Sequence, residues 1–180
     1  MKKIVVTGGS GFIGSNLVKY LLKKKYFVIN IDKLSYSSNP YNTKDIALNK
    51  NYIFYRTDIN NKIKVKKILH RHKPNIIFNL AAETHVDRSI DNPDSFIKSN
   101  ILGVYNLLQS ILTYNNKNSK KIKLIHVSTD EVYGDILTGR TDENFSYNPS
   151  SPYSASKASA DHLIRSYVRT YNFPAIISNC

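Results

Sequence analysis

Residues 3–14 read Lys-Ile-Val-Val-Thr-Gly-Gly-Ser-Gly-Phe-Ile-Gly. The apolar, β-branched start of this stretch, residues 3–7, is typical of a buried parallel strand. Apolar residues with helical spacing begin at Phe12 and continue to Leu22, which predicts a helix directly after the glycines. A strand, a glycine turn and a helix N-terminus in this order form an anion site, because the turn exposes backbone N–H groups and the helix dipole adds partial positive charge.

The glycines at positions 8, 11 and 14 give G-x-x-G-x-x-G, which is one residue longer in its first gap than the dinucleotide fingerprint G-x-G-x-x-G. On its own, this spacing also fits an ordinary glycine-rich turn. Asp32 adds a second signal, since it ends the next apolar run, residues 27–31, about 20 residues after the turn. A carboxylate there accepts hydrogen bonds from the adenosine ribose and repels a 2′-phosphate, so the sequence predicts NAD rather than NADP as the cofactor.

The composition fits one globular domain of ordinary size. The chain has 180 residues, of which 41% are hydrophobic, and it carries a formal net charge of +13. Such a charge raises the question of a nucleic-acid partner. The lysines are scattered, however, over a helix end at residues 23–25, a solvated helical face at residues 62–73 and a strand border at residues 120–123. We therefore expect a lysine-rich solvated surface and no nucleic-acid partner.

Cysteine usage and hydropathy indicate a reducing, aqueous compartment. Cys180 is the single cysteine, so no intramolecular disulfide can form. No apolar run approaches the ~20 residues that a membrane span needs. The apolar run after the basic start at residues 1–3 is too short for a signal peptide. We expect a cytoplasmic protein with no membrane partner, and we expect no metal site.

Strands alternate with helices along the whole chain. The pattern predicts further strands at residues 51–55, 75–81, 122–127 and 175–178, and helices at residues 63–72, 93–114 and 152–171. Residues 33–45, 115–121 and 129–150 are polar and predict loops. This alternation indicates an α/β fold, a Rossmann-type doubly wound parallel sheet of order 3-2-1-4-5-6 that occupies residues 1–180.

Ligands of such sheets bind beyond the carboxyl ends of the strands. One group of reactive side chains expected there is Ser128, Thr129, Asp130 and Glu131, in which two hydroxyls precede two adjacent carboxylates. Neighbouring carboxylates can have different pKa values, so that one is a protonated acid and the other an ionised base. On the pair alone, a solvated acidic loop is the favoured interpretation.

A second group is Tyr153 and Lys157, which are four residues apart and therefore share one face of the predicted helix. A nearby ammonium favours the phenolate, so Tyr153 could act as a base near neutral pH, and Lys157 could also hold a ribose. Such a pair also arises by chance on exposed helices. Combined with the glycine turn and Asp32, it predicts a dinucleotide-dependent active site.

Motifs at residues 7–14, 32–36, 80–90, 128–134, 151–158 and 178–180 carry a family resemblance that spans the whole chain. The chain resembles the extended short-chain dehydrogenases/reductases and, within them, the dTDP-glucose 4,6-dehydratases. The glycine motif and the Tyr153–Lys157 pair identify only the superfamily. The adjacent Asp130 and Glu131 are the specific part, because related sugar epimerases usually have small or neutral residues there.

The resemblance implies NAD-dependent dehydration of a nucleotide-activated hexose, dTDP-glucose, by a lyase. Tyr153, aided by Thr129 and favoured as phenolate by Lys157, takes the proton of the sugar 4-hydroxyl while hydride leaves C4. Glu131 then removes the C5 proton as Asp130 protonates the departing 6-hydroxyl, and hydride returns to C6. The family also suggests a surface-polysaccharide deoxysugar such as rhamnose as the final product.

The resemblance also assigns binding positions. Thr84, which replaces the more usual Ser and keeps its hydroxyl, and Asn179 match substrate-contacting positions, as do Thr129, Asp130 and Glu131. Asp58 follows the third strand, where it is within reach of an adenine amino group or caps the next helix. The residues expected to contact NAD are Gly8, Gly11, Phe12, Ile13, Gly14, Asp32, Lys33, Leu34, Ser35, Asp58, Ile59, Leu80, Ala81, Ala82, Ser99, Val127, Tyr153, Lys157 and Cys180.

Length is the point at which the chain departs from the family, whose members are much longer. We therefore expect the cofactor domain of a truncated sequence, with affinity for the cofactor but little turnover. The family forms homodimers through two helices, here residues 93–114 and 152–171, although their apolar residues fit packing on the sheet equally well. The alternatives are another member of the superfamily, such as a nucleotide-sugar 4-epimerase or decarboxylase, which Asp130 and Glu131 argue against, and a non-catalytic NAD-binding module.

Overall fold

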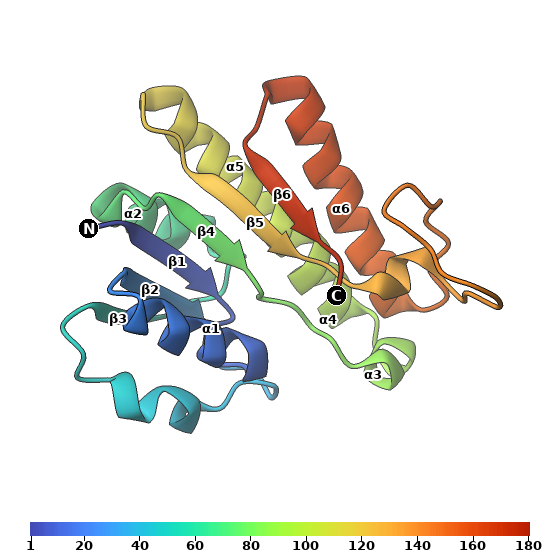
Figure 1. The fold of residues 1–180 in the computed structure, drawn as a ribbon, viewed down its shortest axis with the longest axis horizontal. Coiled ribbons are helices and arrows are strands. Elements are labelled where there is room, and N and C mark those ends of the chain that lie inside the picture. The colour runs from blue at the N-terminus through green and yellow to red at the C-terminus, as the bar shows by residue number, and fades with distance from the viewer.

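A computed structural model describes residues 1–180, which form one six-stranded parallel sheet flanked by helices (Figure 1). The strands are β1 (Lys3–Thr7), β2 (Phe27–Asp32), β3 (Tyr52–Arg56), β4 (Ile76–Asn79), β5 (Lys123–Val127) and β6 (Ala175–Ser178). Their order is β3-β2-β1-β4-β5-β6, and every neighbouring pair is parallel. This confirms the predicted doubly wound order, in which the strand order reverses between β1 and β4.

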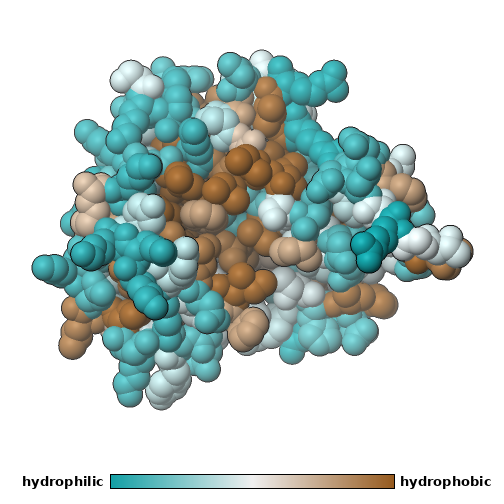
Figure 2. All heavy atoms as spheres, viewed as in Figure 1, coloured by the Kyte–Doolittle hydropathy of each residue, from teal (hydrophilic) through white to brown (hydrophobic).

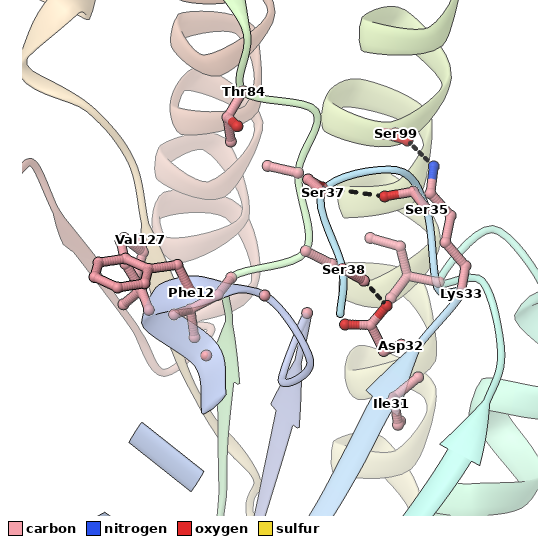
Figure 3. Close-up of a pocket in the computed structure, with 18 of the residues that line it drawn as sticks. Phe12, Ile31, Asp32, Lys33, Ser35, Ser37, Ser38, Thr84, Ser99 and Val127 are labelled. Carbon is pink, nitrogen blue, oxygen red and sulfur yellow. Dashed lines mark hydrogen bonds between the residues drawn. The ribbon is translucent and has the colours of Figure 1, made fainter. Parts of the chain in front are cut away.

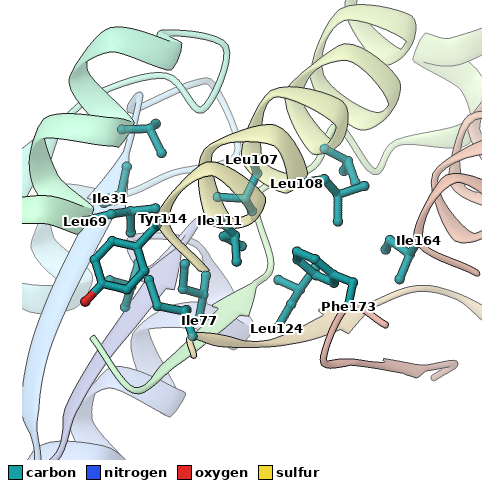
Figure 4. Packing of buried hydrophobic residues seen from close by; sticks show 14 of the residues in the cluster. Ile31, Leu69, Ile77, Leu107, Leu108, Ile111, Tyr114, Leu124, Ile164 and Phe173 are labelled. Carbon is teal, nitrogen blue, oxygen red and sulfur yellow. The ribbon is translucent and has the colours of Figure 1, made fainter. Parts of the chain in front are cut away.

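The helices cover the two faces of the sheet unequally. α1 (Phe12–Lys23) packs over β1 and β2 on one face. α2 (Lys62–His72), α5 (Gly103–Lys117) and α6 (Pro152–Tyr171) pack on the other face, where they enclose the larger core (Figure 4). The short helices α3 (Val86–Asp91) and α4 (Asp94–Phe96) follow β4. None of the helices has the length and hydropathy that crossing a bilayer requires.

The larger core holds α5 against the middle of the sheet. Ile29 and Ile77 of the sheet are fully buried, as are Leu107, Leu108 and Ile111 of α5. These α5 residues are spaced by one, three and four positions, so they form one apolar stripe. Burying each such side chain stabilises the fold by about 1.5–3 kcal/mol. The same packing fixes the position of the segments before α5, which border the carboxyl ends of the strands.

The opposite face of β4, β5 and β6 carries no helix. Because side chains alternate along a strand, this face presents Ile76, Phe78 and Ile125, which are half-buried, and Ile176, which is 64% exposed. Figure 2 shows apolar side chains gathered at the centre of this face. The molecule therefore exposes an apolar surface on one half of its sheet.

The predicted helix at residues 93–114 differs from the structure. It consists of α4, a π-helical segment η2 (Ile97–Leu102) and α5, rather than one regular helix. A π-helical turn contains an extra residue, and such turns are frequent at functional sites. Here the turn buries two polar side chains, Ser99 and Asn100. The helix at Val86–Asp91 was not predicted, because six residues are too few for a clear apolar period.

The predicted loops contain short helical turns. The 3₁₀ helix η1 (Pro40–Ile46) begins within residues 33–45 and ends one residue after them, and its N-cap Asn39 accepts a hydrogen bond from the Tyr41 N–H at 3.0 Å. Residues 129–150 include the 3₁₀ helix η3 (Asp130–Tyr133). The strand predicted at 75–81 ends earlier, at Asn79. Beyond it, the Ala81 N–H donates at 3.3 Å to the side-chain oxygen of Thr7 in the neighbouring strand β1, and not to a backbone carbonyl.

Candidate cofactor and active site

A cavity of about 370 Å³ opens at the carboxyl ends of the strands (Figure 3). It crosses the place where the strand order reverses, which is where doubly wound sheets bind ligands. All but one of the residues expected to contact NAD line it, the exception being Leu34. Those that line it are Gly8, Gly11, Phe12, Ile13, Gly14, Asp32, Lys33, Ser35, Asp58, Ile59, Leu80, Ala81, Ala82, Ser99, Val127, Tyr153, Lys157 and Cys180.

The glycine turn is required for packing at two positions and leaves space at a third. Gly8 has φ +71°, and a Cβ there would lie 2.8 Å from the Ala81 backbone nitrogen. A Cβ on Gly14 would lie 2.1 Å from the Gly8 carbonyl oxygen. A Cβ on Gly11 would meet nothing closer than 3.4 Å, and Gly11 lines the cavity. The backbone at Gly11 is therefore open to a ligand atom that approaches it closely.

The N-terminus of α1 supplies donors to this part of the cavity. Its N-cap, Gly11, has no side chain with which to cap the helix, so the first-turn N–H groups have no internal partner. Phe12 and Ile13 in this turn are 83% and 58% exposed and line the cavity. Unpaired N–H groups and the helix dipole favour an anion here, and a pyrophosphate fits this donor set.

Asp32 lies at the end of β2, buried except for 4% of its surface. Its Oδ2 accepts a hydrogen bond from the Ser10 N–H at 2.9 Å, and its Oδ1 accepts from the Leu34 N–H and the Ser38 hydroxyl, each at 2.8 Å. A carboxylate offers about four acceptor directions, so one remains for a ribose hydroxyl. Leu34 thus acts through its backbone, in the left-handed conformation with φ +60°, rather than by lining the cavity.

Asp58 lies beyond β3 and does not cap α2. Its Oδ1 accepts from the Asn60 N–H at 2.8 Å and from the Asn60 side-chain amide at 3.2 Å. The N-cap of α2 is Asn61, which accepts from the Lys64 N–H at 3.0 Å. Asp58 therefore forms a local turn and keeps its carboxylate in the cavity wall.

Tyr153 lies in the first turn of α6, buried at the edge of the cavity. Its backbone N–H donates to the Ser89 hydroxyl of α3 at 3.0 Å, and its ring contacts Phe96 edge-on. Burial raises the pKa of the phenol, a hydrogen bond with Thr129 opposes this rise, and the charges of Glu131 and Asp130 add to it. The predicted lowering of the Tyr153 pKa by Lys157 is therefore wrong for this structure.

Lys157 lies one turn further along α6, and its ammonium faces the sheet. Its Nζ donates to the Val127 carbonyl oxygen at 2.6 Å. Burial lowers the pKa of Lys157 to about 8, although the neighbouring Asp161 opposes the shift. The Lys157 ammonium is therefore held at the end of β5, and it is not among the groups that shift the pKa of Tyr153.

Thr129, Asp130 and Glu131 follow β5 and lie outside the cavity lining. Thr129 is buried and N-caps η3 by accepting from the Glu131 N–H at 3.3 Å, whereas both carboxylates are exposed. Burial and then the charge of Asp130 raise the pKa of Glu131. Because both carboxylates affect the pKa of Tyr153, the structure brings these residues to the Tyr153 end of the site.

The other two predicted substrate positions, Thr84 and Asn179, occupy different places. Thr84 is exposed and lines the cavity, while Asn179 lies beyond β6, outside the lining. The Asn179 side-chain amide donates to the Thr129 carbonyl oxygen at 3.1 Å, so Asn179 borders the η3 turn.

Sequence reasoning missed four lining residues, which are Ile31, Ser37, Ser38 and Thr57. Ser128, which was expected at the carboxyl ends of the strands, also lines the cavity. The motif that contains Asp32 continues with serines, and hydroxyls so close to a predicted ribose-binding carboxylate could have indicated Ser37 and Ser38. No such signal pointed to Thr57, because a threonine directly after a strand is common and belongs to no motif identified in the sequence.

A buried polar cluster behind Lys157 was also missed. The Asp161 Oδ2 accepts from the Ser128 hydroxyl at 2.6 Å and from the Tyr147 hydroxyl at 3.0 Å, while its Oδ1 lies 3.7 Å from Nε2 of His126. Burial raises the pKa of Asp161 and, with the charge of Lys157, holds the pKa of His126 well below its ordinary value. The periodicity of side chains along a single helix or strand cannot reveal this cluster, because its members come from separate elements.

Comparisons with known proteins agree with this geometry. A family model described as GDP-mannose 4,6 dehydratase matches residues 5–180. The dTDP-glucose 4,6-dehydratase of Neisseria meningitidis serogroup B is 43% identical over 189 residues, which cover 100% of this chain and 53% of that protein. The dTDP-glucose 4,6-dehydratase 1 of Escherichia coli K12 is 43% identical over 195 residues, covering 99% and 54%. The chain thus spans about half the length of the curated relatives it matches.

Solved structures give the same result. The dTDP-glucose 4,6-dehydratase of Bacillus anthracis in complex with NAD has a TM-score of 0.88 and 41% identity, covering 100% of this chain and 55% of that one. The Streptomyces venezuelae enzyme with NAD and TYD bound has a TM-score of 0.92 and 37% identity, covering 99% and 55%. With its Rossmann-type sheet and a family match over nearly its whole length, the chain belongs to the GDP-mannose 4,6-dehydratase family.

Proposed function

We propose that residues 1–180 form the NAD-binding part of a nucleotide-sugar 4,6-dehydratase that acts on dTDP-glucose. Relatives of that name are 43% identical to this chain, and two related structures contain NAD. One observation carries the proposal: the cavity, the Tyr153 phenol and the Asp130–Glu131 pair occupy one edge of the sheet, close enough for both carboxylates to affect the pKa of the phenol.

The residues present fit a dinucleotide. The N-terminus of α1 and the open position at Gly11 would hold the pyrophosphate, Asp32 the adenosine ribose and Lys157 the second ribose. When bound, NAD would accept hydride from C4 of the sugar, return it to C6, and add a positive charge to the cavity that Tyr153 lines. That charge would oppose the effect of burial on the Tyr153 pKa, so the phenol could take the proton of the 4-hydroxyl.

The two carboxylates would carry out the elimination of water. Glu131 would take the proton from C5, and Asp130 would give its proton to the departing 6-hydroxyl, so that one water leaves. The raised pKa of Glu131 makes its ionised form a stronger base, which suits the removal of a carbon-bound proton. An adjacent acid and base at the start of η3 can perform these two transfers on neighbouring carbons.

The test uses the protein expressed from its complete gene, incubated with dTDP-glucose and NAD, with products identified by NMR. A 4-keto-6-deoxy sugar supports the proposal, whereas a sugar inverted at C4 indicates an epimerase. Bound NAD without turnover indicates a non-catalytic module. Glu131→Gln should abolish dehydration, and Glu143→Gln, which alters an exposed carboxylate in the loop after η3, is the matched control. Dehydration that survives Glu131→Gln contradicts the role of Glu131.

We further propose a homodimer formed through η2, α5 and α6. Its support is a set of exposed apolar side chains on these elements: Ile97, Leu102 and Tyr105 are 44%, 47% and 40% exposed, and Val168 and Tyr171 are 38% and 51% exposed. A stable interface needs about 800 Å² from each partner. Sedimentation of the complete protein tests this, with Leu102→Glu expected to produce monomers. A wild-type monomer at micromolar concentration would overturn it.

We also propose a cytoplasmic location and a role in supplying a deoxysugar, such as rhamnose, for a surface polysaccharide. The support is the single cysteine and the similarity to relatives named for the first chemical step. Cell fractionation and sugar analysis of a strain lacking the gene test the two parts. Unchanged rhamnose content in that strain contradicts the proposed role.

A further inference from the structure

Lys33 lines the cavity next to Asp32, but its ammonium is held by other groups. Its Nζ donates to Oε1 of Glu83 at 2.8 Å and to the Ser99 hydroxyl at 2.9 Å. Figure 3 shows the Lys33 side chain directed toward Ser99 and away from the Asp32 carboxylate. A cation beside the predicted ribose site is therefore already paired with groups of the protein.

The surroundings of Asp32 would otherwise suit a phosphate. Ser35, Ser37 and Ser38 line the same end of the cavity, with the Ser38 hydroxyl donating to Asp32 and the Ser35 and Ser37 hydroxyls 3.1 Å apart. Several hydroxyls with one ammonium form a common donor set for a phosphate monoester. The 2′-phosphate is the group that distinguishes NADP from NAD. The Asp32 charge and the pairing of Lys33 both oppose its binding here.

Glu83 is well placed to retain Lys33. The Glu83 side chain is only 6% exposed, and Lys33 is its ion-pair partner. The Glu83 backbone is fixed as well, since its N–H donates to Asn100 and its carbonyl oxygen accepts from Asn100, each at 2.9 Å. If Lys33 moved to a phosphate, a buried carboxylate would lose its cation, which is strongly unfavourable.

We infer that Glu83 is a second determinant of cofactor choice, which excludes 2′-phosphorylated dinucleotides by holding Lys33 while Asp32 repels the phosphate directly. This rests on the proposed binding of NAD at the cavity. Glu83 is a positioning residue in this scheme, because it acts through Lys33 and does not itself line the cavity.

The experiment measures NAD and NADP dissociation constants by calorimetry for the wild type, Asp32→Ser, Glu83→Gln, the double variant, and the double variant with Lys33→Met added. Asp32→Ser alone should improve NADP affinity by about tenfold. Adding Glu83→Gln should improve it by a further factor of about 10–100, since a freed ammonium can make one charge-assisted hydrogen bond to the phosphate. Adding Lys33→Met should remove that second gain.

The outcomes separate this inference from the proposed function. A wild-type protein that binds no NAD refutes the proposed function, and this inference falls with it. Tight wild-type NAD binding together with equal NADP affinity in Asp32→Ser and the double variant refutes only the role of Glu83. A second gain that survives Lys33→Met also refutes it, because the effect would then not pass through the lysine. Melting temperatures of all variants exclude unfolding as the cause.

Discussion

Replacing single glycines of the turn by alanine should separate packing from ligand binding. In Gly14→Ala the new Cβ would lie 2.1 Å from the Gly8 carbonyl oxygen and 2.8 Å from the Gly9 Cα. Both are backbone atoms that cannot rotate away, so α1 must shift relative to β1. Overpacking of this kind costs about 1–3 kcal/mol or more. The better helix propensity of alanine returns at most ~1 kcal/mol.

The expected net loss for Gly14→Ala is about 2 kcal/mol in the free energy of unfolding. For a domain of this size, that loss lowers the melting temperature by about 4–8 °C. Urea denaturation followed by circular dichroism measures the free energy, and calorimetry measures NAD affinity on the same samples.

Gly11→Ala is the matched variant, and it should behave in the opposite way. Its Cβ would lie 3.4 Å from the Gly8 carbonyl oxygen and 3.9 Å from the Ser37 carbonyl oxygen, which are ordinary contacts. With φ −75° at this position, alanine adopts the backbone conformation without strain, and stability should change by less than ~1 kcal/mol. The methyl group would enter the space proposed for the pyrophosphate, so NAD affinity should fall at least tenfold. Equal stability losses in the two variants, or unchanged NAD binding by Gly11→Ala, would refute the reasoning.

Three further substitutions test the buried polar groups. Lys157→Met should raise the free energy of unfolding at pH 7 by up to about 3 kcal/mol, because the pKa of Lys157 falls from 10.5 to about 8 on folding and each pKa unit is worth about 1.4 kcal/mol. The gain should narrow as the pH rises above 8, where the folded wild type no longer carries that proton; urea titrations that find equal gains at pH 7 and 9 would contradict this. Wild-type stability should fall below pH 6.5 by up to about 1.4 kcal/mol per pH unit, because only the unfolded chain protonates His126, and His126→Gln should flatten this slope in the same titrations. Asn100→Ala should lower the free energy of unfolding by about 2–4 kcal/mol, measured by calorimetry, since it leaves the Glu83 backbone N–H and carbonyl unpaired; Asn106→Ala, at a half-buried position of the following helix α5, is the control, and equal losses would count against this role.

The fold was predictable because its signals are local. The apolar runs that became β1, β2 and β5 are bounded by glycines or polar residues, and their alternation with helices implies the sheet order through a general rule of handedness. The cavity followed from Gly8 and Asp32, since the ends of parallel strands must meet at one edge. These inferences needed spacing and no knowledge of long-range contacts.

The electrostatics of the site were not predictable in the same way. Tyr153 and Lys157 share a helical face, as their spacing requires, but the Val127 carbonyl from a distant strand holds the lysine. The raised pKa of Tyr153 depends on burial and on charges that come from η3, 22 residues away for Glu131. In the sequence Glu83 is only one polar residue of a motif. Its role depends on contacts with Lys33 and Asn100, which are distant along the chain.

The π-helical turn at Ile97–Leu102 has a consequence for changes in chain length. It joins two parts with separate tasks, because Ser99 and Asn100 contact Lys33 and Glu83 while Leu107, Leu108 and Ile111 pack in the core. Deleting one residue here would remove the extra residue of the π turn and restore the regular α-helical ladder, so that α5 keeps its orientation on the sheet. The polar pair would then lose the wide turn that places it beside Lys33 and Glu83, while the apolar stripe would stay in the core. A one-residue deletion in this segment should therefore damage the site more than the fold.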